Sequence, residues 1–181
     1  MAGPPCAGKS TLMAALTAGC ERAPADLPVP HSRLIDPADG SVVGAELGRD
    51  RAGFPGTDAL GMAVSPVACR WVQGGGPALL LAEGDRLAHM GFLRAAAAGG
   101  YAVTLAHLNA PAEVLDERCG WRGSTQNDAW RRGRATKAAR LATAAAAAGL
   151  AVTSLDAADP VDELVTQLRT AVPALSALPE A

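Results

Sequence analysis

Residues 3–11 read GPPCAGKST, and this stretch decides the fold class of the chain. It matches the pattern G-x-x-x-x-G-K-[ST] of a phosphate-binding loop over its full length. The glycines Gly3 and Gly8 let the backbone curl so that successive N–H groups point at a phosphate chain, and Lys9 adds a positive charge. The Ser10 hydroxyl is placed to take one position around Mg²⁺. The stretch therefore predicts binding of ATP or another nucleoside triphosphate together with Mg²⁺.

A helix is expected to start inside this loop, as the motif requires. The apolar residues Leu12, Met13 and Leu16 have helical spacing, and Gly19 stops the pattern. The N-terminal dipole of such a helix, about half a unit charge, faces the bound phosphates. We therefore predict that the whole loop binds the nucleotide, through Gly3, Pro4, Pro5, Cys6, Ala7, Gly8, Lys9, Ser10 and Thr11.

Only Met1 and Ala2 precede the loop, although such a loop normally follows a buried strand. The missing strand would be the centre of the sheet, so its loss would leave two neighbouring strands unpaired and one side of the core open. Two explanations stay open at this point. Either the natural chain starts upstream of Met1, or the protein folds with only a short remnant of that strand.

Length and composition predict a single domain spanning residues 1–181, with an unremarkable net charge of −2. No apolar run is long enough to cross a bilayer, and no basic leader with an apolar stretch opens the chain, so we expect no contact with membranes. The four cysteines form no C-x-x-C pair and lie near no histidines at ligand spacing, which argues against a zinc site and against a disulfide framework. The expected compartment is the reducing cytoplasm.

Apolar runs and breakers predict strands that alternate with helices. The strands are expected at residues 33–35, 78–82, 101–108 and 150–155, and the helices at residues 57–72, 87–98, 111–119, 128–148 and 160–172. This alternation is typical of an α/β fold with a parallel, doubly wound sheet. The region 37–77 is rich in Gly and Pro and is the natural place for an acceptor-binding insertion.

Two acids follow predicted strands, where a phosphate-loop enzyme keeps its metal and base. Glu83 follows ALLLA and is the candidate that holds Mg²⁺ through a water, whereas Asp36 is placed to take a proton from an acceptor hydroxyl. Each could instead be a helix cap or a turn residue. Asp85 and Arg86 come directly after Glu83 in the sequence EGDR, and Arg86 is a candidate for holding the acceptor.

Positive charge is concentrated in residues 118–140, which we call the basic segment. It holds seven Arg or Lys residues and one acid, a local charge of +6, so the remainder of the chain carries −8. The segment looks like a lid that could bring several guanidinium groups onto the transferred phosphoryl group, with Arg118, Arg122 and Arg134 as catalytic candidates and Arg131 on the same helix face as Arg134. A polyanion docking on this face and a solvated basic helix both remain open.

Two tryptophans, Trp121 and Trp130, lie within the basic segment of a chain that has only six aromatic residues. They either stack on a base of the acceptor or anchor a lid to its own core. Stacking would make both tryptophans part of the acceptor site.

With these motifs in one order, the chain resembles the P-loop nucleoside, nucleotide and small-molecule kinases. The resemblance implies a parallel sheet with strand order 2-3-1-4-5, in which the first strand is truncated or missing, and it makes Asp36 the general base. More narrowly, the combination of GTDAL (residues 56–60), EGDRL and RGSTQNDAWRRGRATK looks like small phage-type kinases, including those that phosphorylate 5-hydroxymethylpyrimidines in DNA. That likeness adds Asp58, within GTDAL, to the acceptor-binding candidates. The missing first strand and a lid without zinc cysteines depart from the family's pattern.

Three functions remain open at this stage. The first is an ATP-dependent kinase acting on a hydroxyl of a nucleotide or of a modified base in DNA, which the basic segment and its tryptophans favour. The second is a kinase for a sugar, antibiotic or other small metabolite, which the overall acidity favours. The third is a regulatory ATPase or ATP-binding module. The chain has no N-K-x-D motif, which guanine specificity would require.

Overall fold

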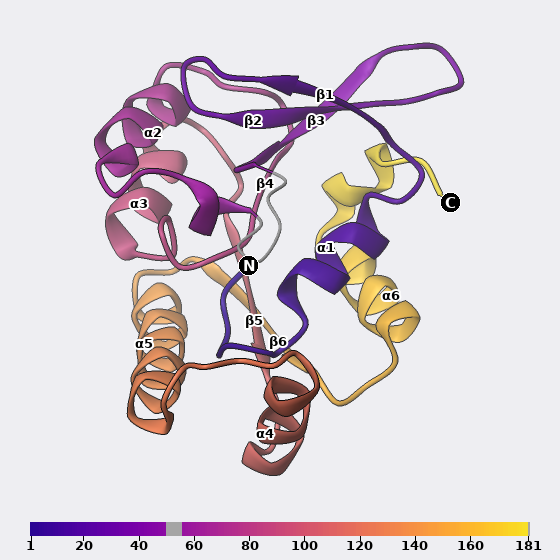
Figure 1. Ribbon diagram of the computed structural model, residues 1–181. Coiled ribbons are helices and arrows are strands. Elements are labelled where there is room, and N and C mark those ends of the chain that lie inside the picture. The colour runs from indigo at the N-terminus through magenta and orange to yellow at the C-terminus, as the bar shows by residue number, and fades with distance from the viewer. Residues whose placement is uncertain (50–55, 181) are drawn as a thin grey trace.

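The computed structural model describes residues 1–49 and 56–180, and it has a mixed α/β architecture (Figure 1). Its helices are α1 (Lys9–Leu16), α2 (Val64–Gln73), α3 (Met90–Ala98), α4 (Ala112–Trp121), α5 (Asp128–Ala147) and α6 (Val161–Ala171), with 3-10 turns at Thr57–Ala59 and Pro173–Ala177. Its strands are β1 (Glu21–Ala25), β2 (His31–Ile35), β3 (Val42–Leu47), β4 (Leu80–Ala82), β5 (Thr104–Asn109) and β6 (Ala151–Asp156).

The strands do not form one parallel sheet. β1, β2 and β3 form an antiparallel meander, and only then does β3 pair in parallel with β4. β5 and β6 form a separate parallel pair. The prediction of an all-parallel sheet is therefore wrong for the first strands. The physical reason is that the links before and after β2 are only a few residues long, too short for the crossover that parallel neighbours require.

The two residues before the phosphate-binding loop lie between the two sheets. The N–H of Ala2 donates to the carbonyl of Ala106 and its own carbonyl accepts from the N–H of Leu108, both at 2.9 Å, so it pairs with β5 like a strand residue. On the other side, the amino group of Met1 donates to the carbonyl of Ala82, at the end of β4, at 2.6 Å. Beyond this bridge, an apolar cavity of about 430 Å³ separates β4 from β5.

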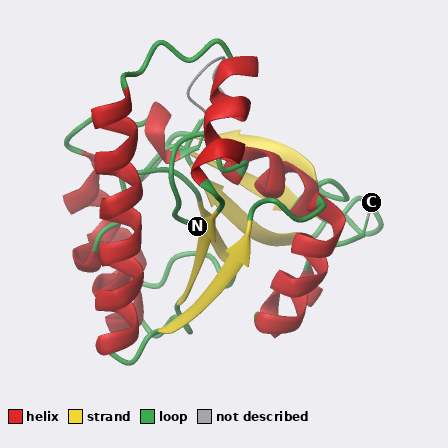
Figure 2. Ribbon diagram, turned by 90° about the horizontal axis from the view of Figure 1, so that it is seen from below, coloured by secondary structure: helices red, strands yellow, loops and turns green. Residues whose placement is uncertain are grey.

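Helices cover both faces of the strands (Figures 1 and 2). The buried apolar side chains form two hydrophobic clusters. The first cluster joins α2, α3 and α5 through Val72, Phe92 and Leu141. The second joins α1 and α6 to β5 and β6, and Leu12 and Leu168 are among its buried members. Each large apolar side chain buried in this way stabilises the fold by about 1.5–3 kcal/mol. None of the helices in residues 1–49 and 56–180 is long and apolar enough to span a membrane.

Candidate active site

The phosphate-binding loop, residues 3–11, links the bridge at Ala2 to helix α1. Gly8 is the N-cap of α1 and has a φ of 81°, a left-handed conformation that favours glycine. Gly3 is needed for a different reason, because a Cβ there would lie 2.5 Å from the carbonyl oxygen of Leu108 in β5. The two glycines of the motif therefore shape the loop and let it approach the strand next to it. The predicted helix starts at Lys9, as the motif indicates.

The Lys9 side chain folds back over the loop at residues 3–11. Its Nζ donates to the carbonyl of Pro4 at 2.9 Å and to that of Gly3 at 3.2 Å. Burial lowers the pKa of Lys9, while the negative charges of Glu83, Asp58 and Asp85 oppose this shift. The ammonium group is thus held by neutral carbonyls and can exchange them for phosphate oxygens, which bind a cation more strongly.

Ser10 and Glu83 form the oxygen-rich corner of the site. The Ser10 hydroxyl donates to Oε1 of Glu83 at 3.0 Å, and the Glu83 side chain is buried. Burial raises the pKa of Glu83, and the bond from Ser10 lowers it by less. A hydroxyl beside a carboxylate suits Mg²⁺, which binds oxygens and keeps several waters and phosphate ligands. Within the described residues, no group of three or more His, Cys, Asp or Glu side chains could hold a metal ion.

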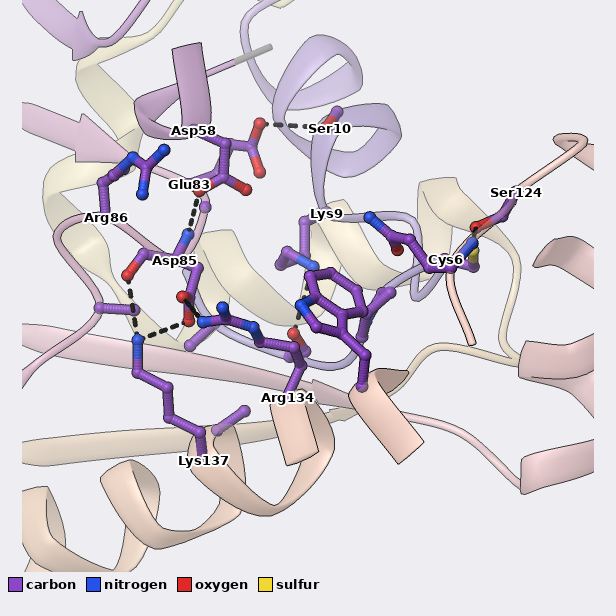
Figure 3. Close-up of a pocket in the computed structure, with 18 of the residues that line it drawn as sticks. Cys6, Lys9, Ser10, Asp58, Glu83, Asp85, Arg86, Ser124, Arg134 and Lys137 are labelled. Atoms are coloured by element: carbon purple, nitrogen blue, oxygen red, sulfur yellow. Dashed lines mark hydrogen bonds and ion pairs between the residues drawn. The ribbon is translucent and has the colours of Figure 1, made fainter. Parts of the chain in front are cut away.

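A cavity of about 450 Å³ opens over the loop and is the natural place for substrates (Figure 3). Four parts of the chain contribute to its lining: the phosphate-binding loop, the 3-10 turn Thr57–Ala59, the EGDR sequence after β4, and the turn and helix of the basic segment. Among the predicted site residues, those at the cavity are Gly3, Pro5, Cys6, Lys9, Ser10, Asp58, Glu83, Asp85, Arg86, Arg122, Trp130 and Arg134. The structure therefore brings together most of the residues that the sequence singles out.

Asp85 joins the EGDR sequence to helix α5. Its carboxylate pairs with Arg134 and, at 2.7 Å, with Nζ of Lys137. Its backbone N–H donates to Oδ1 of Asp58 at 2.7 Å, which fixes the Asp58 carboxylate at the cavity wall. Arg86 donates through Nε to the carbonyl of Leu60 at 3.3 Å. The ion pairs of Asp85 with Arg134 and Lys137 thus hold α5 at the cavity.

The arginines of the basic segment divide into two groups. Arg122 and Arg134 line the cavity. Arg118 instead donates to the carbonyl of Ala157 at 2.6 Å, in the turn after β6, and does not line the cavity. Arg118 thus lies apart from Arg122 and Arg134, and its convergence on the phosphates when ATP and acceptor are bound stays a prediction. Arg131 also lies outside the cavity, and it pairs with Asp116 and Asp128.

The two tryptophans of the basic segment differ in exposure. The Trp121 side chain is 78% exposed at the end of α4, and Trp130 is 38% exposed. The guanidinium carbon of Arg134 lies 5.1 Å from the centre of the Trp130 ring, a cation–π contact at the cavity wall. Of the two alternatives, the core anchor is wrong for Trp121, whereas a stacking role stays open for Trp130.

Asp36 does not lie with the other candidates. Asp36 follows β2, which runs antiparallel to β3, so Ile35 at the end of β2 pairs with Val42 at the beginning of β3. Glu83 follows Ala82, which pairs with Leu47 at the other end of β3. Asp36 is therefore near the opposite edge of the sheet from Glu83. There its Oδ1 accepts the N–H of Ala38 at 2.8 Å. Asp36 is therefore a turn residue, which was the alternative interpretation, and the prediction that it lies beside the phosphates is wrong.

Two of the scattered cysteines form a disulfide, contrary to expectation. Cys6 in the phosphate-binding loop is bonded to Cys119 in α4, with a Cα–Cα distance of 5.4 Å, while Cys20 and Cys69 are free. The two partners are 113 residues apart, and no local spacing indicates such a pair. The folding of α4 against the loop brings them together.

Sequence reasoning also missed residues around the site. Lys137 lies at the main cavity, and its place in the basic segment was the one available signal. A second cavity of about 280 Å³ shares Ser10 and Glu83 with the first. Three charged residues line this second cavity, Arg22 in β1, Glu46 in β3 and Arg49 just after β3, and neither strand was predicted from the sequence.

The predicted acceptor-binding insertion, residues 37–77, includes residues 50–55, which lie outside the described residues.

Comparison with known proteins agrees with this geometry. Searches of curated proteins and of solved structures find no match. A family model described as P-loop Nucleotide Kinase3 matches residues 1–169, which include the phosphate-binding loop, the EGDR sequence and the basic segment. Because the match covers nearly the whole chain, the protein belongs to the P-loop Nucleotide Kinase3 family.

Proposed function

We propose that this protein is an ATP-dependent kinase that transfers the γ-phosphate to a hydroxyl group on a nucleotide or on a 5-hydroxymethylpyrimidine base in DNA. One observation carries the proposal. A single cavity combines a phosphate-binding loop, the Ser10–Glu83 pair suited to Mg²⁺, and the cationic side chains of Arg122 and Arg134. Phosphoryl transfer depends mostly on positioning and on charge stabilisation, and these groups supply both.

On the nucleotide side, each part of the loop has a role. The N–H groups between Gly3 and Ser10 and the positive end of α1 bind the phosphate chain. Lys9 leaves the loop carbonyls and neutralises charge that builds up as the phosphoryl group moves. Ser10 and Glu83 would hold Mg²⁺, which would supply positive charge to the phosphates.

The strand pairings support the family's sheet order 2-3-1-4-5. In this scheme β3, β4, the Met1–Ala2 bridge, β5 and β6 take the five places, and β1 and β2 are antiparallel additions at the edge. The support comes from the parallel pairs β3–β4 and β5–β6 and from the contacts of the bridge with Ala82 and Ala106. The loop then lies at the carboxyl edge of the strands, where nucleotides bind in such sheets.

On the acceptor side, we propose that Asp58 takes the proton from the attacking hydroxyl. Asp58 lines the same cavity as Lys9, and its carboxylate is oriented by the N–H of Asp85. Its charge also acts on the pKa of both Lys9 and Glu83, so it lies within electrostatic reach of the reaction centre. A base must lie near the group that loses the proton, and Asp36 does not meet this condition.

The basic segment is the proposed lid. Arg134 now pairs with Asp85, and it would exchange this carboxylate for the transferred phosphoryl group when substrates bind. Arg122, directly after α4, lines the same cavity. Two guanidinium groups would then stabilise the negative charge of the transition state, a role that contributes strongly in phosphoryl transfer.

The choice of acceptor rests on the surface of this segment. A net charge of +6 and two exposed tryptophans favour a nucleic acid, which binds through phosphate charge and base stacking. The second candidate is a small metabolite. It is favoured by the ion pairs of Arg131, Arg134 and Lys137 with acids of the same chain, which reduce the charge left for a polyanion.

The test offers radiolabelled ATP with hydroxymethylated DNA, with mononucleotides and with a panel of sugars and antibiotics. Labelling of DNA that falls steeply between about 50 and 200 mM salt supports the DNA acceptor, because counterion release makes such binding salt-dependent. Labelling of a metabolite alone, with little salt dependence, assigns the second candidate. Hydrolysis of ATP without any labelled acceptor would make the protein a regulatory ATPase and contradict both.

A further inference from the structure

The disulfide between Cys6 and Cys119 joins two walls of the substrate cavity. Cys6 lies in the phosphate-binding loop and lines the cavity, where Figure 3 shows it beside Ser124. Cys119 lies in α4, between Arg118 and Arg122 of the basic segment, and does not line the cavity. A covalent bond therefore ties the loop that binds phosphates to the segment that covers them.

The bond also fixes the start of the turn that leads to α5. The carbonyl of Cys119 accepts the N–H of Ser124 at 3.0 Å. The turn that follows, residues 122–126, lines the cavity. The disulfide thus restrains two segments at the cavity, the phosphate-binding loop through Cys6 and the turn that carries Arg122 through Cys119.

The backbone of Cys6 gives a second, independent indication. Its φ of 63° is left-handed, and it is the one non-glycine residue with a positive φ among residues 1–49 and 56–180. L-residues other than Gly, Asn and Asp rarely adopt this region, and holding one there is unfavourable by about 1–2 kcal/mol in general. The bond to Cys119 in α4 restricts the movement of this residue. Without the bond, the loop would have to adopt the left-handed conformation again each time a nucleotide binds.

We propose that Cys6–Cys119 is a redox-modification site that controls nucleotide affinity: the disulfide form holds the loop ready for phosphates, and the dithiol form binds them more weakly. The inference rests on the proposed function only in so far as the loop binds a nucleotide. The change is a loss of preorganisation, because the reduced loop and turn must be ordered during binding.

The reaction at this site is exchange with a dithiol reductant. A thiolate of the reductant attacks Sγ of Cys6, the sulfur–sulfur bond breaks, and Cys119 leaves as a thiolate and takes up a proton. The second thiol of the reductant then displaces Cys6, so the reductant loses two electrons and becomes a disulfide. Attack at Cys6 is favoured, because Cys6 is half-buried whereas Cys119 is only 2% exposed. A disulfide of the same class reverses the reaction.

The remaining cysteines provide matched controls. Cys69 lies in α2 and Cys20 lies just before β1, and both are free and partly exposed. Neither lines the main cavity. Cys69→Ser therefore removes a thiol without touching the cross-link.

The experiment measures binding of Mg·ADP by titration calorimetry, so that it does not depend on phosphoryl transfer. Wild type is compared before and after treatment with dithiothreitol, with Cys119→Ala and Cys69→Ser measured without reductant. Thiol counts under denaturing conditions should give two free thiols before reduction and four after it. We expect about tenfold weaker binding for reduced wild type and for Cys119→Ala, the size expected for fixing the backbone of about one loop residue during binding. Cys69→Ser should bind like oxidised wild type.

Three results separate the possible failures. Four free thiols before reduction would overturn the inference, because no disulfide would exist. Equal ADP affinity in oxidised and reduced wild type, both folded by circular dichroism, would overturn it while leaving the kinase intact. Absence of ADP binding in both forms would instead overturn the proposed function, and the inference with it.

Discussion

At the scale of single residues, the structure separates Asp58, which the sequence predicts to bind the acceptor, from Asp36, which the sequence predicts to be the general base. Asp58 lies at the cavity and accepts the N–H of Asp85, whereas Asp36 accepts the N–H of Ala38 in a turn at the other edge of the sheet. Asp58→Asn should therefore lower kcat about a hundredfold, the range in which general bases contribute, and leave ATP affinity nearly unchanged. Asp36→Asn is the control and should be close to wild type. Steady-state kinetics that showed the reverse order would return the base to Asp36.

Burial of Glu83 makes a prediction about pH. The folded protein raises the pKa of Glu83 through burial, so it holds this proton more tightly than the unfolded chain does. The resulting stability is fully present below the pKa of glutamate in the unfolded chain and is lost as the pH rises through the raised folded pKa. Glu83→Gln, which avoids ionisation, should therefore gain stability relative to wild type as the pH rises from acid to neutral.

Denaturant unfolding of wild type and Glu83→Gln in metal-free buffer at several pH values measures this difference. A difference that stayed constant with pH would show that the carboxylate is not desolvated. In the presence of Mg²⁺ and nucleotide, wild type should become more stable than Glu83→Gln, since the variant lacks the negative charge expected to bind the ion.

Single residues were predictable where a motif fixes both type and spacing. Gly8, Lys9 and Ser10 could be assigned from the sequence because the loop brings its own geometry with it. Asp36 was misplaced because its assignment required the direction of a strand, and strand direction depends on contacts between distant segments.

At the scale of elements, helix α5 places Arg134 and Arg131 on different surfaces. Arg134 lines the cavity and pairs with Asp85, while Arg131 pairs with Asp116 and Asp128 outside it. Arg134→Ala should lower kcat by about a hundredfold or more, with a smaller change in ATP affinity, because its charge acts on the transferred phosphoryl group. Arg131→Ala should change kcat little. Equal effects of the two substitutions would make the segment a solvated basic surface and not a lid.

Elements were predictable where their apolar pattern is local. The strands β4, β5 and β6 and the helices α3 to α6 fall within a few residues of their expected positions. The strands β1 and β3 were missed, because ERAPA contains charges and a proline and VVGAEL lies in a region rich in Gly and Pro. Both strands are held by pairing with β2, which no local pattern reveals.

At the scale of the whole molecule, the disulfide closes a loop of 113 residues. A cross-link of this kind lowers the conformational entropy of the unfolded chain. In the chain-entropy model, closing a loop of about 100 residues stabilises the folded state by about 4.7 kcal/mol. Dithiothreitol should therefore lower the free energy of unfolding by several kcal/mol, and Cys119→Ala should show the same loss without reductant. Urea unfolding measures both values. Identical midpoints for oxidised and reduced wild type would mean that the cross-link does not act on the unfolded chain.

The overall α/β architecture could be predicted from the alternation of apolar runs, but the arrangement of the sheets could not. The disulfide and the antiparallel meander both join segments through tertiary contacts, and a single sequence carries no record of which distant segments meet. The short bridge at Met1 and Ala2 shows the same limit, because its pairing with Ala82 and Ala106 follows from where β4 and β5 pack.

The central claim is that the loop at residues 3–11 drives phosphoryl transfer from ATP, and Lys9 tests it most directly. The measurement follows the labelled γ-phosphate from ATP to the acceptors named above, with wild type and with Lys9→Ala of confirmed fold. We expect a labelled acceptor with wild type and a rate at least about a hundredfold lower with the variant, because the lysine charge stabilises the moving phosphoryl group. Near-normal transfer by Lys9→Ala, or no transfer to any acceptor by wild type, would contradict the claim.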